Sequence, residues 1–414
     1  NIISILAAHN PMRAWVATLK WYFLPLLFAF ALAHLTWNRF RLYAFLATAL
    51  FAASISSLIA LDQHYGFTEW GPGLPRLGLG GLLFNRNLAA EYHALFLPIT
   101  LGLFFFVRRR LLRVFLMGLL LCLLLPTLVL STARGAWVGL MVGSLLIGLT
   151  SLGLIVRRKL QIGKNYRSFA LRAGAFILLA FALPIYVFTT PFWKHVDKQN
   201  IQESTDEVVH RFLDVIPIRK GASVMSVEHR FELWQDAIEG SLESSSIFGC
   251  GQDHYELFFH QSAKRSDDPP IVGRLVRYTH NDFLQTLFEN GILGLIGLLG
   301  MWGFVLWRGM QTVLQCAMSG DLSGFSLRLG FLAAASVFLV TMMFEFPARM
   351  PATIVVGWSL FGLILGHSAK IGSKGLPLMV SIGPKASLFI GSVGIILIPY
   401  GLWLGKNIFF VTEN

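Results

Sequence analysis

The sequence predicts an all-α protein that crosses a membrane many times. Of its 414 residues, 55% are hydrophobic and only 14% are charged, which is too few charges to cover the surface of a soluble domain of this length. Apolar runs long enough to cross roughly 30 Å of hydrocarbon recur along the whole chain. Basic residues gather in every second loop between these runs, as is typical of a polytopic membrane protein.

About ten membrane-spanning helices are visible in the sequence. We expect them at residues 15–35, 43–61, 89–107, 112–130, 136–156, 168–188, 283–307, 329–346, 352–365 and 386–404, of which the ninth is short. The chain begins at Asn1 in an apolar stretch. We interpret this stretch as the remnant of an earlier helix, with N-terminal helices missing.

The charge pattern orients these helices. The basic loops are expected on the cytoplasmic side and contain Arg39 and Arg41, Arg108 to Arg113, Arg157 to Arg167, Arg308 and Arg328, and Lys370 to Lys385. The other loops are expected to face outward. The excess of positive charge therefore reflects the orientation of the chain in the membrane. We expect no nucleic-acid partner.

Three regions follow from this topology. Residues 1–188 are predicted to form membrane helices with short loops, and residues 283–414 the C-terminal membrane helices. Residues 189–282 are predicted to form one large, mainly helical outward segment that carries site residues. Between Pro191 and Thr279 this segment has 10 Lys/Arg and 14 Asp/Glu, so it is mildly acidic while the whole chain is basic.

The sequence contains no motif that is typical of a metal site or a nucleotide site. Cys122, Cys250 and Cys316 make no metal pattern, and no HExxH or CxxC spacing occurs. A phosphate-binding glycine loop and a serine nucleophile elbow are also absent from the sequence. We therefore expect no metal ion and no cofactor.

Arginines on the outward side are candidates for an anion site. Arg134 lies in a tight turn at residues 131–137, where a cation runs against the positive-inside bias and a guanidinium fork suits phosphate. The alternative for Arg134 is a side chain that reaches the outer lipid headgroups. Arg86 precedes the third span between Asn85 and Asn87, either of which can cap that helix.

Two further cations lie in the large outward segment. Arg230 opens an amphipathic helix over residues 230–242, close to Glu228 and Glu232. A salt bridge within this helix is the alternative to an anion-binding role for Arg230. Arg211 is another outward cation, and the sequence does not indicate its direction.

His280 is the sharpest candidate for chemistry, because it joins the outward segment to the seventh span. A histidine beside polar neighbours at a membrane surface can act as a general base near neutral pH. The alternative is structural: Asn281 or Asp282 caps the helix and His280 is merely adjacent. Small residues at Gly291 and Gly294 permit close helix packing one turn or more beyond this junction.

Taken in order, these stretches resemble the O-antigen ligase and polymerase family of bacterial envelope glycosyltransferases. Residues 131–137, STARGAW, are similar to the Arg-Gly-Ala-Trp turn of that family. Residues 230–234 and 247–251 are similar to its Arg-x-x-x-Trp helix and Gly-x-Gly turn. His280-Asn281, nine residues, and Gly291-x-x-Gly294 fit the ligase pattern, while residues 84–87 resemble a weaker signature.

The resemblance implies a GT-C-like membrane fold and an O-antigen ligase. Such an enzyme is a metal-independent, inverting glycosyltransferase of the bacterial inner membrane, with its active site facing the periplasm. It would move polysaccharide from undecaprenyl pyrophosphate to a sugar hydroxyl of lipid A–core, so its partners would be both of these substrates and membrane lipid. The resemblance assigns catalysis to His280, donor pyrophosphate binding to Arg134, Arg230, Arg211 and Arg86, and supporting roles to Asn281, Asn85, Asn87 and Trp137.

Other functions share part of this pattern. An O-antigen polymerase of the same family carries the same motifs. A flippase for lipid-linked sugars has the same topology but is expected to carry charged residues within its helices, whereas the polar residues here gather at the outer face. A peptidoglycan polymerase of the shape–elongation–division type also uses a lipid donor, but its motifs are absent from the sequence.

Overall fold

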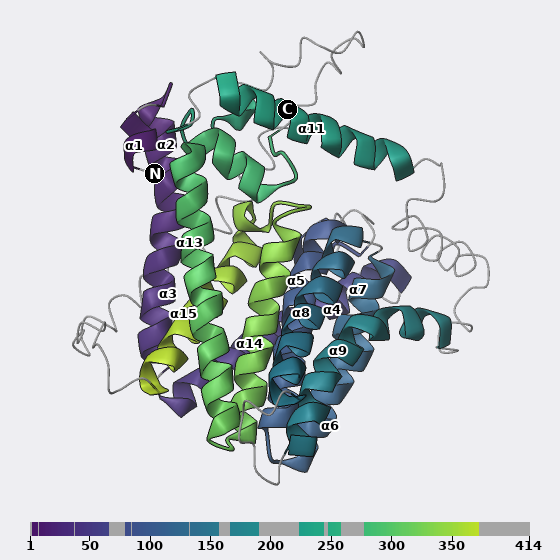
Figure 1. The fold of residues 1–414 in the computed structure, drawn as a ribbon. Helices are drawn as coiled ribbons and strands as arrows, with labels where there is room; N and C mark the ends of the chain where they lie inside the picture. Colours follow the sequence, from purple (N-terminus) through teal and green to yellow (C-terminus); the bar gives the residue numbers. More distant parts are fainter. Residues whose placement is uncertain are drawn as a thin grey trace.

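The protein is an all-α polytopic membrane protein. The structure is a computed structural model that describes residues 2–6, 8–36, 38–65, 79–83, 85–131, 133–156, 166–189, 223–243, 247–257 and 277–371. Within these segments the regular structure is helical, and no strand is formed (Figure 1). Seven of the helices there are long and apolar enough to cross a membrane. The predicted fold class is confirmed.

Most of the helices form a bundle, and one helix lies across its end (Figure 1). They are α1 (Ile2–Leu6), α2 (Pro11–Thr18), η1 (Leu19–Phe23), α3 (Leu24–Leu35), α4 (Arg39–Tyr65), η2 (Gly81–Leu83), α5 (Arg86–Phe106), α6 (Arg110–Leu119), η3 (Leu120–Leu124), α7 (Leu125–Leu130), α8 (Arg134–Val156), α9 (Tyr166–Thr189), α11 (Ser223–Glu243), α13 (Asp282–Met318), α14 (Leu322–Thr341), η6 (Pro347–Arg349) and α15 (Pro351–Ile371). The helix that lies across the end is α11.

Nine of the ten predicted spans coincide with helices, and the span at 386–404 lies outside the described residues. One predicted loop is wrong: Arg308 lies inside α13 and Arg328 inside α14. The chain turns only at Ser319–Asp321, where Gly320 has a φ of 73° and Asp321 caps α14. The apolar run ends before the helix does, because polar residues that leave the hydrocarbon can continue helical hydrogen bonding.

Helix α14 lies at the centre of the bundle, packed against α5 and α8 through small residues. A Cβ atom at Gly102 of α5 would lie 2.7 Å from the carbonyl oxygen of Ser326. At Gly330 of α14 it would lie 2.7 Å from that of Pro98. These two contacts make α5 and α14 antiparallel and allow their backbones to approach closely, as in other membrane helix pairs.

The two ends of the bundle differ in charge and in what they carry. At one end, which we call the basic end, α4 begins at Arg39, α6 begins at Arg110 and α14 begins at Leu322. At the opposite end α5, α8, α13 and α15 begin, and α11 lies across it (Figure 1). Since His280 and Arg134 lie at the starts of α13 and α8, this opposite end holds the candidate site.

Helix α13 is interrupted at Gly291, whose φ of 66° and ψ of −173° are not helical. The interruption releases carbonyl groups that the turn at residues 249–251 satisfies. The backbone N–H of Cys250 donates to Phe288 O (3.2 Å), and that of Gly251 donates to Glu289 O (2.8 Å). Gly291, one of the two glycines predicted to pack helices, therefore lies where the turn at residues 249–251 joins α13.

We expect Gly291→Ala to destabilise the protein, because a Cβ atom there would lie 2.2 Å from the carbonyl oxygen of Ile247 and alanine disfavours a positive φ. The loss should exceed about 2 kcal/mol, as is typical when a special backbone position is strained. The midpoint of thermal unfolding in detergent measures it. Gly297→Ala is the matched control, since a Cβ atom at Gly297 meets nothing within 4 Å. Equal midpoints for the two variants would contradict the role given to Gly291.

Candidate functional site

The candidate site is centred on Glu345, a carboxylate that follows α14. His280 Nδ1 lies 2.9 Å from Glu345 Oε2. The Arg230 guanidinium donates to Glu345 Oε1. Glu345 is 5% exposed, whereas the side chains of His280 and Arg230 are 34% and 24% exposed. The carboxylate is thus buried beneath two partners that reach the surface.

Local backbone structure holds His280 against Glu345. Its φ of 53° lies in the left-handed region, which costs a residue other than glycine on the order of 1–2 kcal/mol. The next residue, Asn281, caps α13 by accepting from the N–H groups of Phe283 and Leu284 (3.0 and 3.1 Å). The His280 ring also meets the Phe346 ring edge to face, with centroids 4.9 Å apart. Asn281 therefore caps α13, and the neighbouring His280 side chain contacts the carboxylate of Glu345.

Helix α11 brings Arg230 to this point. Trp234 lies four residues beyond Arg230, on the same face of the helix. Its indole Nε1 donates to the carbonyl oxygen of Thr279 (3.0 Å), the residue before His280. The Arg-x-x-x-Trp spacing thus has a physical reason: the tryptophan ties α11 to the His280 segment while the arginine reaches Glu345. Glu345, the carboxylate that Arg230 contacts, follows α14 and does not belong to α11.

The Arg134 turn lies beside the same carboxylate. A Cβ atom at Gly135 would lie 3.2 Å from Glu345 Cγ, so the backbone next to Arg134 contacts the acid closely. Trp137 is buried, and its Nε1 donates to Leu128 O (2.9 Å), which fixes the connection between α7 and α8. Arg134 itself is half-buried at the first position of α8. The supporting role predicted for Trp137 is thus a structural one in this geometry.

The remaining predicted residues lie at the same end or outside the described part. Asn85 caps α5 by accepting from the N–H groups of Asn87 and Leu88 (2.8 and 3.3 Å), the alternative given for this stretch. Arg86 is exposed at the first position of α5, and Asn87 follows half-buried. Arg211 lies outside the described residues.

A second ionic cluster is sealed behind the first. Arg349 Nη1 lies 2.8 Å from Glu289 Oε2, and its Nε lies 3.7 Å from Asp282 Oδ1. All three side chains are at most 2% exposed. Burial alone would lower the pKa of Arg349, but the carboxylates of Glu289 and Asp282, with the Tyr22 ring, raise it. Arg349 therefore stays charged and joins η6 to α13.

Sequence reasoning missed Glu345 in the first cluster and Glu289 in the second. Glu345 was included in the span at 329–346 and Glu289 in that at 283–307. Glu91, in the span at 89–107, is a third buried acid, at 2% exposure. An ionisable residue inside an apolar span is costly and marks a functional or structural site by default. That signal was present in the sequence and could have found all three.

Among the described residues, no group of three or more His, Cys, Asp and Glu is arranged to hold a metal ion. The chemistry available in this part of the chain comes from one imidazole, one carboxylate and the guanidinium groups around them. An imidazole whose Nδ1 bonds a carboxylate presents its Nε2 to other partners. Guanidinium groups suit phosphate oxygens.

We expect the two ionic clusters to respond differently to loss of their arginine. Arg349→Leu leaves Glu289 and Asp282 buried without their cation, and this should cost about 3–5 kcal/mol of stability. Arg230→Leu should cost much less, because Arg230 and His280 are partly exposed to solvent. Thermal unfolding of both variants against the wild type checks this, and an Arg349→Leu protein as stable as Arg230→Leu would contradict it.

Comparison with known protein families matches the part of the chain that carries three of the candidate site residues. Residues 119–299 match the family described as O-Antigen ligase, and this range contains Arg134, Arg230 and His280. An uncharacterized protein of Haemophilus influenzae is 24% identical over 263 residues, which make up 62% of this chain. The aligned part covers 56% of that relative's length, so the chain spans little more than half of it. The match over residues 119–299 supports membership of this chain in the O-antigen ligase family.

Proposed function

We propose that this protein is an O-antigen ligase, which transfers polysaccharide from undecaprenyl pyrophosphate to a sugar hydroxyl of lipid A–core at the periplasmic face of the bacterial inner membrane. The family match supports an enzyme of the ligase and polymerase type. The single observation that carries the finer proposal is that Glu345 contacts both His280 and Arg230, residues from two separate motifs.

The donor end of the reaction requires cations. As the bond from the sugar C1 to the pyrophosphate oxygen breaks, negative charge builds on the pyrophosphate, and fixed guanidinium groups can stabilise that charge. Arg230 and the Arg134 turn both lie beside Glu345. In this proposal they bind the pyrophosphate, with Arg86 and Arg211 as further expected contacts. The donor is already activated, so the proposal involves no nucleotide and no metal ion.

The acceptor end requires removal of a proton. A sugar hydroxyl oxygen forms the new bond to C1, and its proton passes to His280 Nε2. Glu345 accepts from Nδ1 of the same ring and stabilises the imidazolium that forms, as the carboxylate does in other acid–histidine pairs. A single displacement inverts the configuration at C1, and no covalent enzyme intermediate is formed.

The first test is His280→Gln in a transfer assay with purified protein, pyrophosphate-linked donor and lipid A–core. We expect turnover to fall by at least about 100-fold, the usual contribution of a general base. Binding of the donor should be retained, because the arginines make that contact. His280→Gly is the matched structural control, since glycine adopts the φ of 53° without strain. Near-normal turnover by folded His280→Gly protein would remove His280 from the reaction.

The second test concerns the geometry of the arginines. Arg230→Lys keeps the charge but cannot reproduce a bidentate fork, so kcat/KM should fall on the order of tenfold or more. Arg13→Lys is the control, because Arg13 is paired with Asp253 and Glu256 and not with Glu345. Equal activity of the two variants would contradict pyrophosphate binding by Arg230.

The third test concerns Glu345. Glu345→Gln should lower kcat, because the amide no longer stabilises the imidazolium that forms when His280 takes the hydroxyl proton. The same transfer assay measures kcat for both proteins, and an unchanged kcat in folded Glu345→Gln protein would contradict this role of the carboxylate.

The choice of acceptor separates the related functions. With lipid A–core as acceptor a ligase yields a glycosylated lipid, whereas a polymerase needs a second molecule of the lipid-linked donor. A flippase moves the donor between leaflets and transfers no sugar. Activity that disappears in EDTA and returns with one divalent ion would contradict the metal-independent reaction.

A further inference from the structure

A long apolar groove lies at the basic end, away from Glu345. It has a volume of about 1610 Å³ and runs between α4 and α6, with parts of α5 and α14 as its floor. Small-molecule pockets usually measure about 300–1,000 Å³, so this groove is larger than a soluble metabolite needs. Phe51 and Phe115 line one end and are 67% and 62% exposed. The walls are therefore apolar surface that the described helices do not cover.

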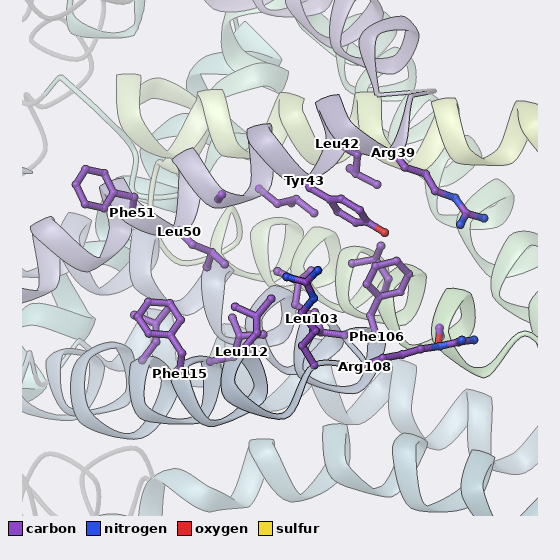
Figure 2. A pocket seen from close by; sticks show the side chains of 18 of the residues that line it. Arg39, Leu42, Tyr43, Leu50, Phe51, Leu103, Phe106, Arg108, Leu112 and Phe115 are labelled. Carbon is purple, nitrogen blue, oxygen red and sulfur yellow. The ribbon is translucent and has the colours of Figure 1, made fainter.

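The other end of the groove is cationic. Arg39, Arg108 and Arg109 line it, and all three are exposed. Within the described part of the chain, none of the three forms an ion pair with an acidic side chain. Figure 2 shows Arg39 and Arg108 directed to the same end of the groove, opposite to Phe51 and Phe115. Apolar and cationic lining are thus separated along the length of the groove.

The groove is longer than one leaflet of a membrane is deep. Along α4 the lining runs from Arg39 to Leu58, which at about 1.5 Å per residue is roughly 28 Å. One leaflet of hydrocarbon is about 15 Å deep, half of the usual bilayer core. An acyl chain that starts at the level of Arg39 therefore fits inside the groove.

The groove is separate from the candidate active site. Asp321 and Arg328, at the first turns of α14, line the groove, whereas Glu345 follows the last turn of the same helix. Helix α14 has 20 residues and is about 30 Å long. A donor whose pyrophosphate lies beside Glu345 cannot also place that group at Arg39.

We propose that this groove binds an anionic diacyl phospholipid, with its phosphate at Arg39, Arg108 and Arg109 and an acyl chain against the apolar walls. Charge complementarity favours this occupant over a further helix of the same chain. The remaining predicted span, at 386–404, contains no acidic residue and is flanked by Lys385 and Lys406. Such a helix would leave the three arginines uncompensated, whereas a phosphate balances them.

Gly118 offers a direct test, because it lines the groove and a Cβ atom there meets nothing within 4 Å. The wild-type protein is purified in detergent, incubated with phosphatidylglycerol or with zwitterionic phosphatidylcholine, and examined by native mass spectrometry. We expect phosphatidylglycerol to be retained in preference. Gly118→Phe should retain less of that lipid, since the ring projects into the groove where the acyl chain would lie. Gly300→Phe is the control, because Gly300 also has open space around it but does not line the groove.

A charge variant provides the second arm. Arg39→Gln combined with Arg108→Gln should reduce the preference for phosphatidylglycerol by about fivefold for each arginine removed. Arg308→Gln is the control, since Arg308 is a cation of α13 outside the groove lining. Equal retention of the two lipids by the wild type, or an unchanged preference in the groove variants, would overturn the proposal. Protein–protein cross-links at Phe51 or Phe115 without retained lipid would also overturn it, in favour of a second copy.

Discussion

The pair of contacts made by Glu345 sets the geometry of the site end of the molecule. Burying a carboxylate is costly unless its charge is compensated, and here His280 and Arg230 each occupy one oxygen. Those contacts hold the left-handed backbone at His280 and hold α11 across the end of the bundle. Gly135 allows the third motif to approach, because a side chain there would press against Glu345 Cγ. One buried charge thus brings together three segments that are distant in the sequence.

The two ionic clusters differ in how far their side chains are exposed to solvent. The Arg349 cluster is buried on all three of its side chains, so its guanidinium lies between two carboxylates and joins η6 to α13. The Glu345 cluster is buried only at its acid, while its imidazole and guanidinium reach the surface. The reaction that we propose depends on this exposure, since it needs Arg230 to meet the donor anion and His280 to meet the acceptor hydroxyl. The same kind of interaction stabilises the fold in one place and leaves groups available for reaction in the other.

The bundle is packed unevenly about α14. Glycines on α5, α8 and α14 bring backbones close together, and this packing fixes the height of Glu345 relative to Arg134. On the other side of α5, α4 and α6 leave an apolar groove between them. Tight packing supports the candidate active site, and looser packing between α4 and α6 leaves a groove whose cationic end is at the opposite end of α14 from Glu345.

The sequence by itself determined the helices, because apolar length and charge alternation are read residue by residue along the chain. It also singled out His280, Arg134 and Arg230 as candidates through short motifs. For the two helix caps it left two choices each, and the structure gives Asn85 and Asn281. It did not identify Glu345, whose partners lie 65 and 115 residues away in the chain. Local patterns contain no information about which helix ends meet. Only helix packing brought that carboxylate to the histidine and the arginine, and only packing decided that Arg349 would be buried between acids.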